Sequence, residues 1–317
     1  MKDIATRQDK DIETRDKAAA LVTAFLSGKS PRTIEAYRQD LLDFAGFIHA
    51  ESGEAAARVL LANGHGEANA LTLAYKSHLL DEGLSPATIN RRLAALRSLV
   101  SMARTLGLIP WTLEVANVKS KAYRDTRGPG SAGVHLILDQ VQGGSLKALR
   151  DRAMLRLLYD LGLRRGEVIS LDLADVDLER CAVSVIGKGR SEKELLTLPE
   201  PTCNALTAWT EARGSEPGPL FTNVDRAGKG QRLTGTSLYR IVRGYGEAAG
   251  LKAWPHGIRH SAVTEAVKLA QAKGYGLEVA QDFSRHMDIR TLMVYRDRER
   301  NYQGELAGLV AETVKCS

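Results

Sequence analysis

A basic, glycine-rich stretch near the middle of the chain limits the possible folds more than any other feature. Residues 117–133 carry four basic side chains, three glycines and a proline, and they show almost no apolar periodicity. Such a stretch is typical of a linker, and 317 residues suit two domains better than one. We therefore expect a charged amino-terminal extension at 1–20, a first domain at 21–116, a basic linker at 117–134 and a second domain at 135–317.

The first domain has the residue spacing of amphipathic helices. Apolar side chains recur at steps of three or four over residues 32–50 and again over 88–106. Ser85 stands before the second of these segments, in a position that suits a helix start. A further helix is expected over 70–80, and Gly83 suits a left-handed cap at its end. The pattern predicts a helical bundle.

The exposed faces of these helices, and the linker, are basic. Such charges usually mark a solvated face, and DNA contact becomes the better interpretation only if a DNA-cutting domain follows. Basic residues in the linker suit a connection that crosses a phosphate backbone, although an ordinary solvated linker is the alternative. The candidate DNA-contacting residues are Arg32, Arg38, Arg91, Arg92, Arg97, Lys119, Lys121 and Arg124.

The second domain mixes helices with a small antiparallel sheet. Helical spacing covers residues 149–163, 200–213 and 236–249. Two strands are expected over 181–186 and 194–198, joined by a glycine-rich turn. The chain as a whole is therefore predicted to be mainly α with a small antiparallel sheet, an α+β protein.

Composition narrows the class of partner and the compartment. The formal net charge of +6 and the isoelectric point near 9.2 favour polyanionic partners without proving one. Cys181, Cys203 and Cys316 match no zinc-ligand spacing, and their odd number suits no disulfide framework, so a reducing cytoplasm is expected. The sequence shows no signal-peptide core and no apolar run long enough to span a bilayer, which predicts a protein without a membrane partner.

The first candidate functional string is Gly162–Glu167, at the end of an apolar helix. Arg164 can donate two parallel hydrogen bonds to a phosphate, and Glu167, one helical turn further on, can orient it. Taken alone, a surface ion pair between these two residues is the simpler interpretation.

The second string places Lys188 between two glycines at the tip of the predicted hairpin. A tight turn of this kind lifts a cation beyond the sheet, where it can enter a DNA groove. Gly-Lys-Gly is also an ordinary solvated turn, so the string has low specificity by itself.

The third string begins at Pro255, which suits the start of a helix. His256 and Arg259 are three positions apart and share a helix face, so an imidazole and a guanidinium can meet one anion there. The alternative is a pair of satisfied polar residues at a helix start. A metal site is disfavoured, because no cysteine or carboxylate at ligand spacing accompanies His256.

In the fourth string His286 precedes Tyr295 by nine residues. Asp288 and Thr291 can cap a short helix that leads to the tyrosine. Because Tyr295 follows three apolar residues, core packing would also explain its presence.

The order of the four strings resembles that of the tyrosine site-specific recombinases of the phage-integrase type. Gly162–Glu167 looks like the first-arginine box of that family, and Lys188 looks like its hairpin lysine. His256–Arg259 looks like the second box, and His286–Tyr295 like the nucleophile box. Four motifs in this order are hard to obtain by chance.

The resemblance covers nearly the whole chain, because residues 30–47 and 84–106 look like the helical, SAM-like core-binding domain of the family. Two features depart from the family pattern. Arg285 stands where family members usually have a glycine before the histidine that corresponds to His286. The spacer between Arg259 and His286 is slightly expanded around residues 273–276. We expect Arg285 to point outward or to reach a phosphate.

The resemblance implies that the chain cleaves and rejoins double-stranded DNA through a 3′-phosphotyrosyl intermediate and a Holliday junction. It also implies a homotetramer on two DNA sites, with no metal and no other cofactor. The roles carried over are Tyr295 as nucleophile, Arg164 and Arg259 as phosphate clamp, His256 as base, Lys188 as acid, His286 as hydrogen-bond donor and Glu167 as support for Arg164.

Two other classes of function fit part of the pattern. A type IB topoisomerase shares the arginine, lysine, histidine and tyrosine chemistry, but the helical amino-terminal domain argues against it. A non-catalytic DNA-binding relative would not need every catalytic position. The tail at 301–314 has apolar residues at helical spacing, and it is expected to dock either on a neighbouring protomer or on its own domain.

Overall fold

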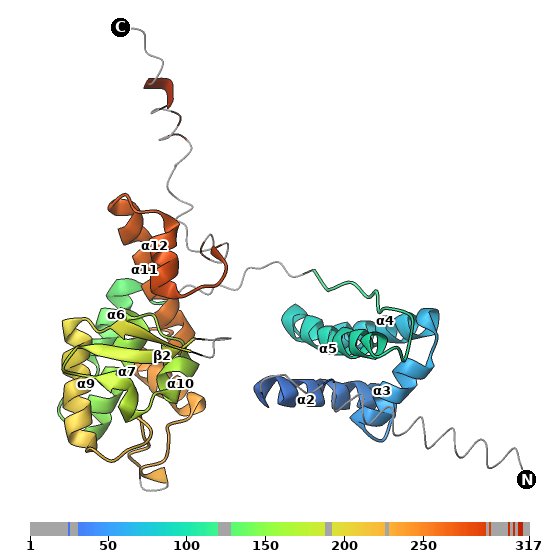
Figure 1. The fold of residues 1–317 in the computed structure, drawn as a ribbon, viewed down its shortest axis with the longest axis horizontal. Helices are drawn as coiled ribbons and strands as arrows, with labels where there is room; N and C mark the ends of the chain where they lie inside the picture. Colours follow the sequence, from blue (N-terminus) through green and yellow to red (C-terminus); the bar gives the residue numbers. More distant parts are fainter. Residues whose placement is uncertain are drawn as a thin grey trace, which may run out of the picture. The chain divides into compact units, whose positions relative to one another are not determined.

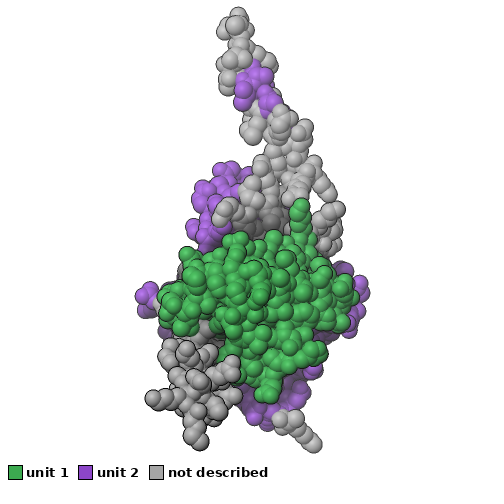
Figure 2. Space-filling view, turned by 90° about the vertical axis from the view of Figure 1, so that its right-hand side faces the viewer, with its two compact units in different colours: residues 1–123 green, residues 124–317 purple. Residues whose placement is uncertain are grey.

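The computed structural model describes residues 25, 31–119, 128–187, 192–225, 228–289, 292, 304, 307 and 310–312. The chain divides into two units, residues 1–123 and residues 124–317, which Figure 2 distinguishes by colour. The division falls inside the stretch that the sequence predicts to be a linker. Within the described part of the chain, no helix is long and apolar enough to cross a membrane.

The described part of the first unit is helical (Figure 1). Its helices are α2 (Pro31–Phe47), α3 (Gly53–Ala62), α4 (His65–Asp81) and α5 (Pro86–Thr105). Helix α5 begins as predicted, because the Ser85 hydroxyl accepts a hydrogen bond from the Thr88 backbone N–H. Gly83, just after α4, has the expected left-handed conformation, with φ of +69°.

Aromatic side chains organise the core of the first unit. The rings of Phe44 and Tyr75 meet edge to face, with their centroids 5.0 Å apart. Leu93 and Leu96 of α5 are buried in the same cluster. The Tyr75 hydroxyl donates to Asp43 at 2.6 Å, which gives the polar end of this buried ring a partner.

The second unit combines helices with one three-stranded antiparallel sheet in the order β1-β2-β3. Val183 of β2 pairs with Leu196 of β3, and Ile186 pairs with Lys193 at the far end of the ladder. The fold class predicted from the sequence is confirmed. The elements in chain order are α6 (Gly130–Asp139), α7 (Leu146–Asp160), α8 (Arg165–Ser170), the 3₁₀ turn η1 (Leu173–Asp175), β1 (Val176–Asp177), β2 (Ala182–Ile186), β3 (Lys193–Thr197), α9 (Glu200–Arg213), α10 (Gly235–Ala248), α11 (Pro255–Ala272) and α12 (Leu277–Ser284).

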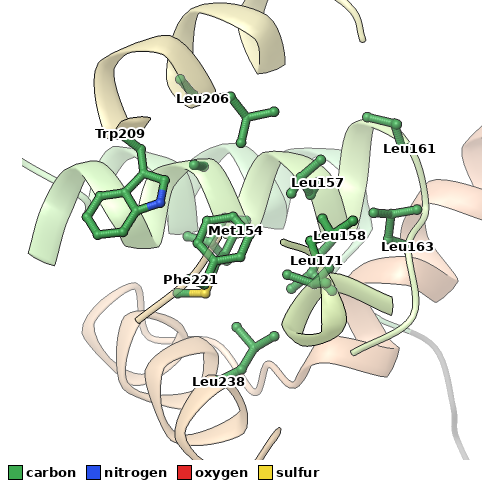
Figure 3. Close-up of a cluster of buried hydrophobic side chains, with 14 of the residues drawn as sticks. Met154, Leu157, Leu158, Leu161, Leu163, Leu171, Leu206, Trp209, Phe221 and Leu238 are labelled. Carbon is green, nitrogen blue, oxygen red and sulfur yellow. The ribbon is translucent and has the colours of Figure 1, made fainter. Parts of the chain in front are cut away.

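Helix α7 forms the centre of the second unit (Figure 3). Its Met154 and Leu158 are buried, and Trp209 of α9 and Leu238 of α10 belong to the same core cluster. Each such side chain contributes roughly 1.5–3 kcal/mol through burial. Because α7 is held on several sides, the turn at its carboxyl end, which leads to Arg164, has a fixed position.

Helix α11 packs against α6, α7 and α12. Val263 and Val267 of α11 cluster with Ala280 of α12 and with Leu292, and all four are buried. This packing brings the start of α11 and the end of α12 toward the same end of α7. Helix α6 begins at Gly130, inside the stretch predicted to be a linker.

The cysteine expectation needs a correction. Cys181, just before β2, and Cys203, on α9, form a disulfide with their Cα atoms 5.7 Å apart. They are 22 residues apart in sequence. The return of the chain from β3 into α9 brings them together, and the Leu198 N–H donates to the Cys181 carbonyl at 2.7 Å. The odd number of cysteines therefore does not prevent one pair from forming.

Candidate active site

Arg164 and Glu167 are held at the start of α8. The Arg164 backbone N–H donates to Glu167 Oε2 at 2.8 Å, so the carboxylate caps the helix. Nη1 of Arg164 donates to Glu167 Oε1 at 2.7 Å. The Glu167 side chain is only 4% exposed, whereas that of Arg164 is 28% exposed. A simple surface ion pair is therefore excluded, because the carboxylate lies inside the protein.

The Glu167 carboxylate is ionised despite its burial. Burial alone would raise the pKa of this carboxyl, but the Arg164 backbone N–H and the Arg285 and Arg164 guanidiniums lower it below its usual value. A permanent negative charge thus lies beneath Arg164 and determines where its guanidinium can point.

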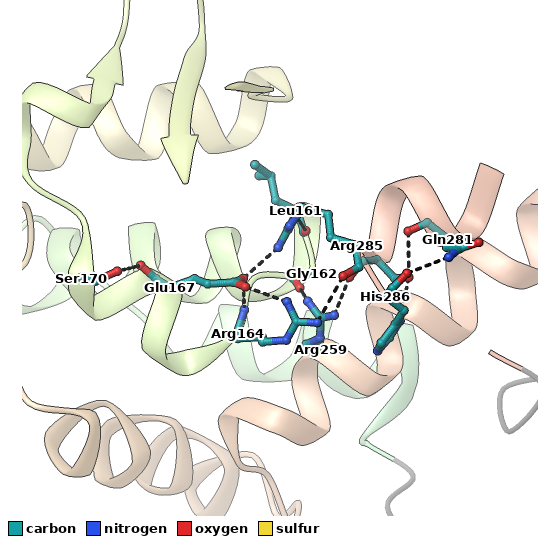
Figure 4. Close-up of polar contacts among 10 residues, drawn as sticks. Leu161, Gly162, Arg164, Glu167, Ser170, Arg259, Gln281, Arg285 and His286 are labelled. Carbon is teal, nitrogen blue, oxygen red and sulfur yellow. Dashed lines mark hydrogen bonds and ion pairs between the residues drawn. The ribbon is translucent and has the colours of Figure 1, made fainter. Parts of the chain in front are cut away.

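Arg259 connects α11 to two other parts of the site (Figure 4). Its side chain donates through Nη1 to the Gly162 carbonyl and through Nη2, at 2.5 Å, to the Ser284 carbonyl. Arg259 is 1% exposed. Gly162 has φ of +56°, a conformation that favours glycine, and it turns its carbonyl toward Arg259 at the end of α7.

His256 and His286 share the electrostatic environment of the two arginines. Burial lowers the pKa of the His256 imidazole, and the charges of Arg259 and Arg164 lower it further. Burial and the same two arginines, with smaller effects from His256 and Arg285, lower the pKa of His286 to about 4. Both imidazoles are therefore neutral at pH 7, so each ring has one nitrogen that donates a hydrogen bond and one that accepts a hydrogen bond.

The end of α12 positions His286 through two hydrogen bonds. His286 Nδ1 lies 2.8 Å from the Ser284 hydroxyl, and Gln281 Nε2 donates to the His286 carbonyl at 2.8 Å. Neither Ser284 nor Gln281 was among the residues predicted from the sequence. Serine and glutamine are common in helices, and their contacts with His286 depend on how the chain turns after α12.

The expectation that Arg285 points outward or reaches a phosphate is wrong. Its side chain is buried, and Nη2 donates to Glu167 Oε2 at 2.8 Å. Arg285 ends α12 in the left-handed conformation, with φ of +52°. Its partner lies 118 residues earlier in the chain, so only the tertiary fold identifies this contact.

The structure describes four of the six predicted catalytic residues. Arg164, His256, Arg259 and His286 gather where α7, α8, α11 and α12 meet. Lys188 and Tyr295 lie outside the described residues. In the described part of the chain, no three His, Cys, Asp or Glu side chains cluster as a metal site requires.

Several candidate DNA-contacting arginines of the first unit bind within that unit. Arg91 donates to Asp40 at 2.5 Å, and Arg92 donates to Asp43 at 2.5 Å. Arg97 donates at 2.6 Å to Asn117 Oδ1 and at 3.0 Å to the Val115 carbonyl. Arg38 and Lys119 are exposed, whereas Lys121, Arg124 and the side chain of Arg32 lie outside the described residues.

Two family models match the chain in the order of its two units. Residues 25–106 match the phage integrase N-terminal SAM-like domain, and residues 132–301 match the phage integrase family. A tyrosine recombinase of Synechocystis sp. is 37% identical over 292 residues, which cover 90% of this chain and 92% of that protein. A tyrosine recombinase of Synechococcus elongatus is 36% identical over 284 residues, which cover 87% and 88%.

Solved structures show the same fold at low sequence identity. The XerH site-specific recombinase bound to a palindromic difH substrate, in a post-cleavage complex, superposes with a TM-score of 0.64 at 21% identity. The match covers 88% of this chain and 80% of that chain. The Tn1549 transposon integrase in complex with transposon right end DNA superposes with a TM-score of 0.64 at 15% identity, covering 95% and 99%.

Proposed function

The chain belongs to the phage integrase family of tyrosine recombinases, which makes it a site-specific enzyme that breaks and rejoins DNA, and we propose how its residues divide this work. One observation carries the proposal. The side chains of Arg164, His256, Arg259 and His286 lie close enough together that the two arginines lower the pKa of both imidazoles. These residues come from three separate parts of the second unit, around α8, α11 and α12. Such a group suits a phosphodiester, whose attack adds negative charge.

Arg164 and Arg259 form the phosphate clamp. A guanidinium stays charged at any physiological pH and matches the spacing of two phosphate oxygens. Hydrogen bonds already hold both side chains, Arg164 on Glu167 and Arg259 on two carbonyls, so little reorganisation is needed when charge develops on the phosphorus.

Tyr295 is the nucleophile and His256 is its base. A phenol with a pKa of ~10 holds its proton at neutral pH, so attack requires an acceptor. The lowered pKa of His256 keeps its imidazole neutral and able to accept that proton. As the tyrosine oxygen bonds to phosphorus, the bond to the 5′ oxygen breaks, and Lys188 returns a proton to this leaving group.

His286 donates a hydrogen bond to a non-bridging oxygen of the phosphate. Donation through Nε2 requires that Nδ1 be the acceptor. In this proposal the Ser284 hydroxyl, 2.8 Å away, donates a hydrogen bond to Nδ1 in place of its 3.2 Å hydrogen bond to the Gln281 carbonyl. Ser284 thereby sets the tautomer that His286 needs.

Rejoining is the same step run backwards with a different 5′ hydroxyl, so no metal or high-energy cofactor is required. In this proposal four protomers bind two double-stranded DNA sites in the cytoplasm and exchange strands through a Holliday junction. The strand exchange integrates, excises or resolves DNA segments, mobile elements among them. The family membership supports this assembly, and the SAM-like domain favours it over a topoisomerase that acts without pairing sites.

A nicked suicide substrate tests the proposal. Cleavage next to the nick releases a short fragment, so rejoining is blocked and the protein stays covalently attached to the 3′ end. We expect an adduct with the natural chain and none with Tyr295→Phe, which keeps the ring but lacks the oxygen. Tight binding of the natural chain with no adduct would instead indicate a non-catalytic DNA-binding protein. Sequencing the DNA that Tyr295→Phe protects identifies the recombination site.

A further inference from the structure

Arg164, Glu167 and Arg285 form a closed ring of contacts beside the clamp (Figure 4). Glu167 accepts from Arg164 through Oε1 and from Arg285 through Oε2, at 2.7 and 2.8 Å. The ring closes through the backbone, because Arg164 Nη2 donates to the Arg285 carbonyl at 3.3 Å. The side chains of both Glu167 and Arg285 are 4% exposed.

We propose that Arg285 is a positioning residue for the cleavage reaction. It compensates the charge of Glu167, so that the carboxylate does not cancel the field of Arg164 and Arg164 keeps its orientation for the scissile phosphate. This inference rests on the proposed role of Arg164 in the phosphate clamp. In this proposal Arg285 acts through Glu167 and not on the DNA, because its Nη2 donates to the Glu167 carboxylate and its Nη1 to the Leu161 carbonyl.

The charges of the ring support this assignment. One carboxylate and two guanidiniums sum to a single positive charge. Without Arg285, Arg164 would be the only counter-ion of a buried carboxylate, and its field would be cancelled where little water screens it. With Arg285 in place, Glu167 is compensated from the protein side, and the partly exposed Arg164 supplies the remaining charge.

The backbone at Arg285 also supports its assignment as a positioning residue. Arg285 stands between Ser284, whose carbonyl accepts from Arg259, and His286. Its left-handed conformation at the end of α12 lets the side chain turn inward to Glu167. The Arg285–Glu167 pair therefore ties the segment that carries His286 to the helix start that carries Arg164.

The first experiment compares cleavage by Arg285→Met and Arg285→Lys on the suicide substrate, in a single turnover with protein in excess. We expect Arg285→Met to cleave about 10- to 100-fold more slowly, an effect as large as that of removing a residue that orients a metal ligand. DNA affinity should change little. Arg285→Lys should recover part of the rate, because it restores the charge in less favourable geometry.

Arg150 provides the matched control. It is buried like Arg285 and pairs with Asp151 at 2.8 Å, but it lies in the amino-terminal half of α7, whereas Arg164 follows the carboxyl end of that helix. We expect Arg150→Met to lower the melting temperature without slowing cleavage, measured below the melting temperatures of both variants. If Arg150→Met slows cleavage as much as Arg285→Met does, the effect is general loss of stability and the proposal is wrong.

A neutral substrate gives a readout that a merely structural role would not change. A methylphosphonate at the cleavage position lacks the charge of one non-bridging oxygen, so the field of Arg164 matters less there. We expect the rate ratio of natural chain to Arg285→Met to fall toward one on this substrate. An equal ratio on both substrates would overturn the proposal.

The double variant Arg285→Met with Glu167→Gln controls for misfolding of Arg285→Met, because it removes the buried carboxylate together with its counter-ion. Since Arg285 acts through Glu167, the double variant should cleave faster than Arg285→Met alone. A slower double variant would contradict this route. Failure of the proposed function itself is distinguishable, because the natural chain would then form no adduct on any substrate.

Discussion

Gly128 lies directly against the carbonyl of Gly257, in the first turn of α11. A Cβ atom on Gly128 would overlap this carbonyl oxygen and the Ser261 hydroxyl. A hydrogen bond two residues further on joins the same two segments, because the Gly130 N–H donates to Ser261 Oγ at 2.9 Å. The segment that enters the second unit is thus in contact with the helix that carries His256 and Arg259.

We expect Gly128→Ala to destabilise the second unit by about 1–3 kcal/mol, the usual cost of inserting a methyl group into a filled space. Displacing the start of α11 should also slow cleavage. Gly144→Ala is the control, because no atom lies within 4 Å of a Cβ at that position. Urea unfolding and suicide-substrate cleavage measure the two effects, and equal behaviour of the two variants would contradict the contact.

The lowered pKa of His286, about 4, makes the stability of the free protein depend on pH. Between pH ~6.5 and that value, the imidazole of the unfolded chain binds a proton while the folded one does not. Stability from this group is therefore complete above pH ~6.5 and is lost as the pH falls toward 4.

His286→Asn removes this contribution. We expect the variant to lose less stability than the natural chain between pH 7 and pH 5, measured by urea unfolding at each pH. The comparison isolates the imidazole, because the carboxyl groups titrate in both proteins. An identical pH dependence would show that the His286 pKa is not lowered.

The helices of the chain could be predicted where local signals are strong. Helix α9 has the predicted bounds, Glu200–Arg213, because a proline precedes it and Gly214 ends it. Helix α3 was missed because its alanine-rich sequence has few large apolar residues, although Ser52 supplies a hydroxyl cap. No helix is predicted from the sequence where α6 lies, because its first residues, from Gly130, belong to the stretch interpreted as a linker.

The sequence predicts which residues belong to the site and their order along the chain, but not the contacts between them. His256 and Arg259 are close in sequence, so helical spacing predicts that they share a helix face. The burial of Arg285 could not be predicted, because it depends on Glu167 in a distant helix. The Cys181–Cys203 pair likewise results from the tertiary path of the chain.

Ser284 gives a direct test of the tautomer proposed for His286. Ser284→Ala removes the hydroxyl 2.8 Å from Nδ1, so no serine hydroxyl can donate a hydrogen bond to that nitrogen and favour the tautomer protonated at Nε2. We expect about a tenfold slower cleavage, comparable with other losses of a residue that orients an imidazole. Nitrogen NMR of the ring should show a changed tautomer ratio, and an unchanged ratio at an unchanged rate would rule out this role.

Arg38 and Arg92 separate DNA contact from structural pairing in the first unit. Arg38 is exposed on α2, whereas Arg92 donates to Asp43, which also accepts from Tyr75. A phosphate contact contributes about one unit to the slope of log affinity against log salt concentration, so Arg38→Gln should lower this slope by that amount at unchanged stability.

Arg92→Gln should behave in the opposite way. Leaving the half-buried Asp43 carboxylate with only the tyrosine hydroxyl costs about 1–3 kcal/mol, so the loss should appear in urea unfolding more than in the salt slope. Anisotropy titrations of the intact chain on its recombination site measure both slopes. A lower salt slope for Arg92→Gln at unchanged stability would contradict this prediction. It would mean that Arg92 releases Asp43 when it binds DNA, so that their ion pair forms only in the free protein.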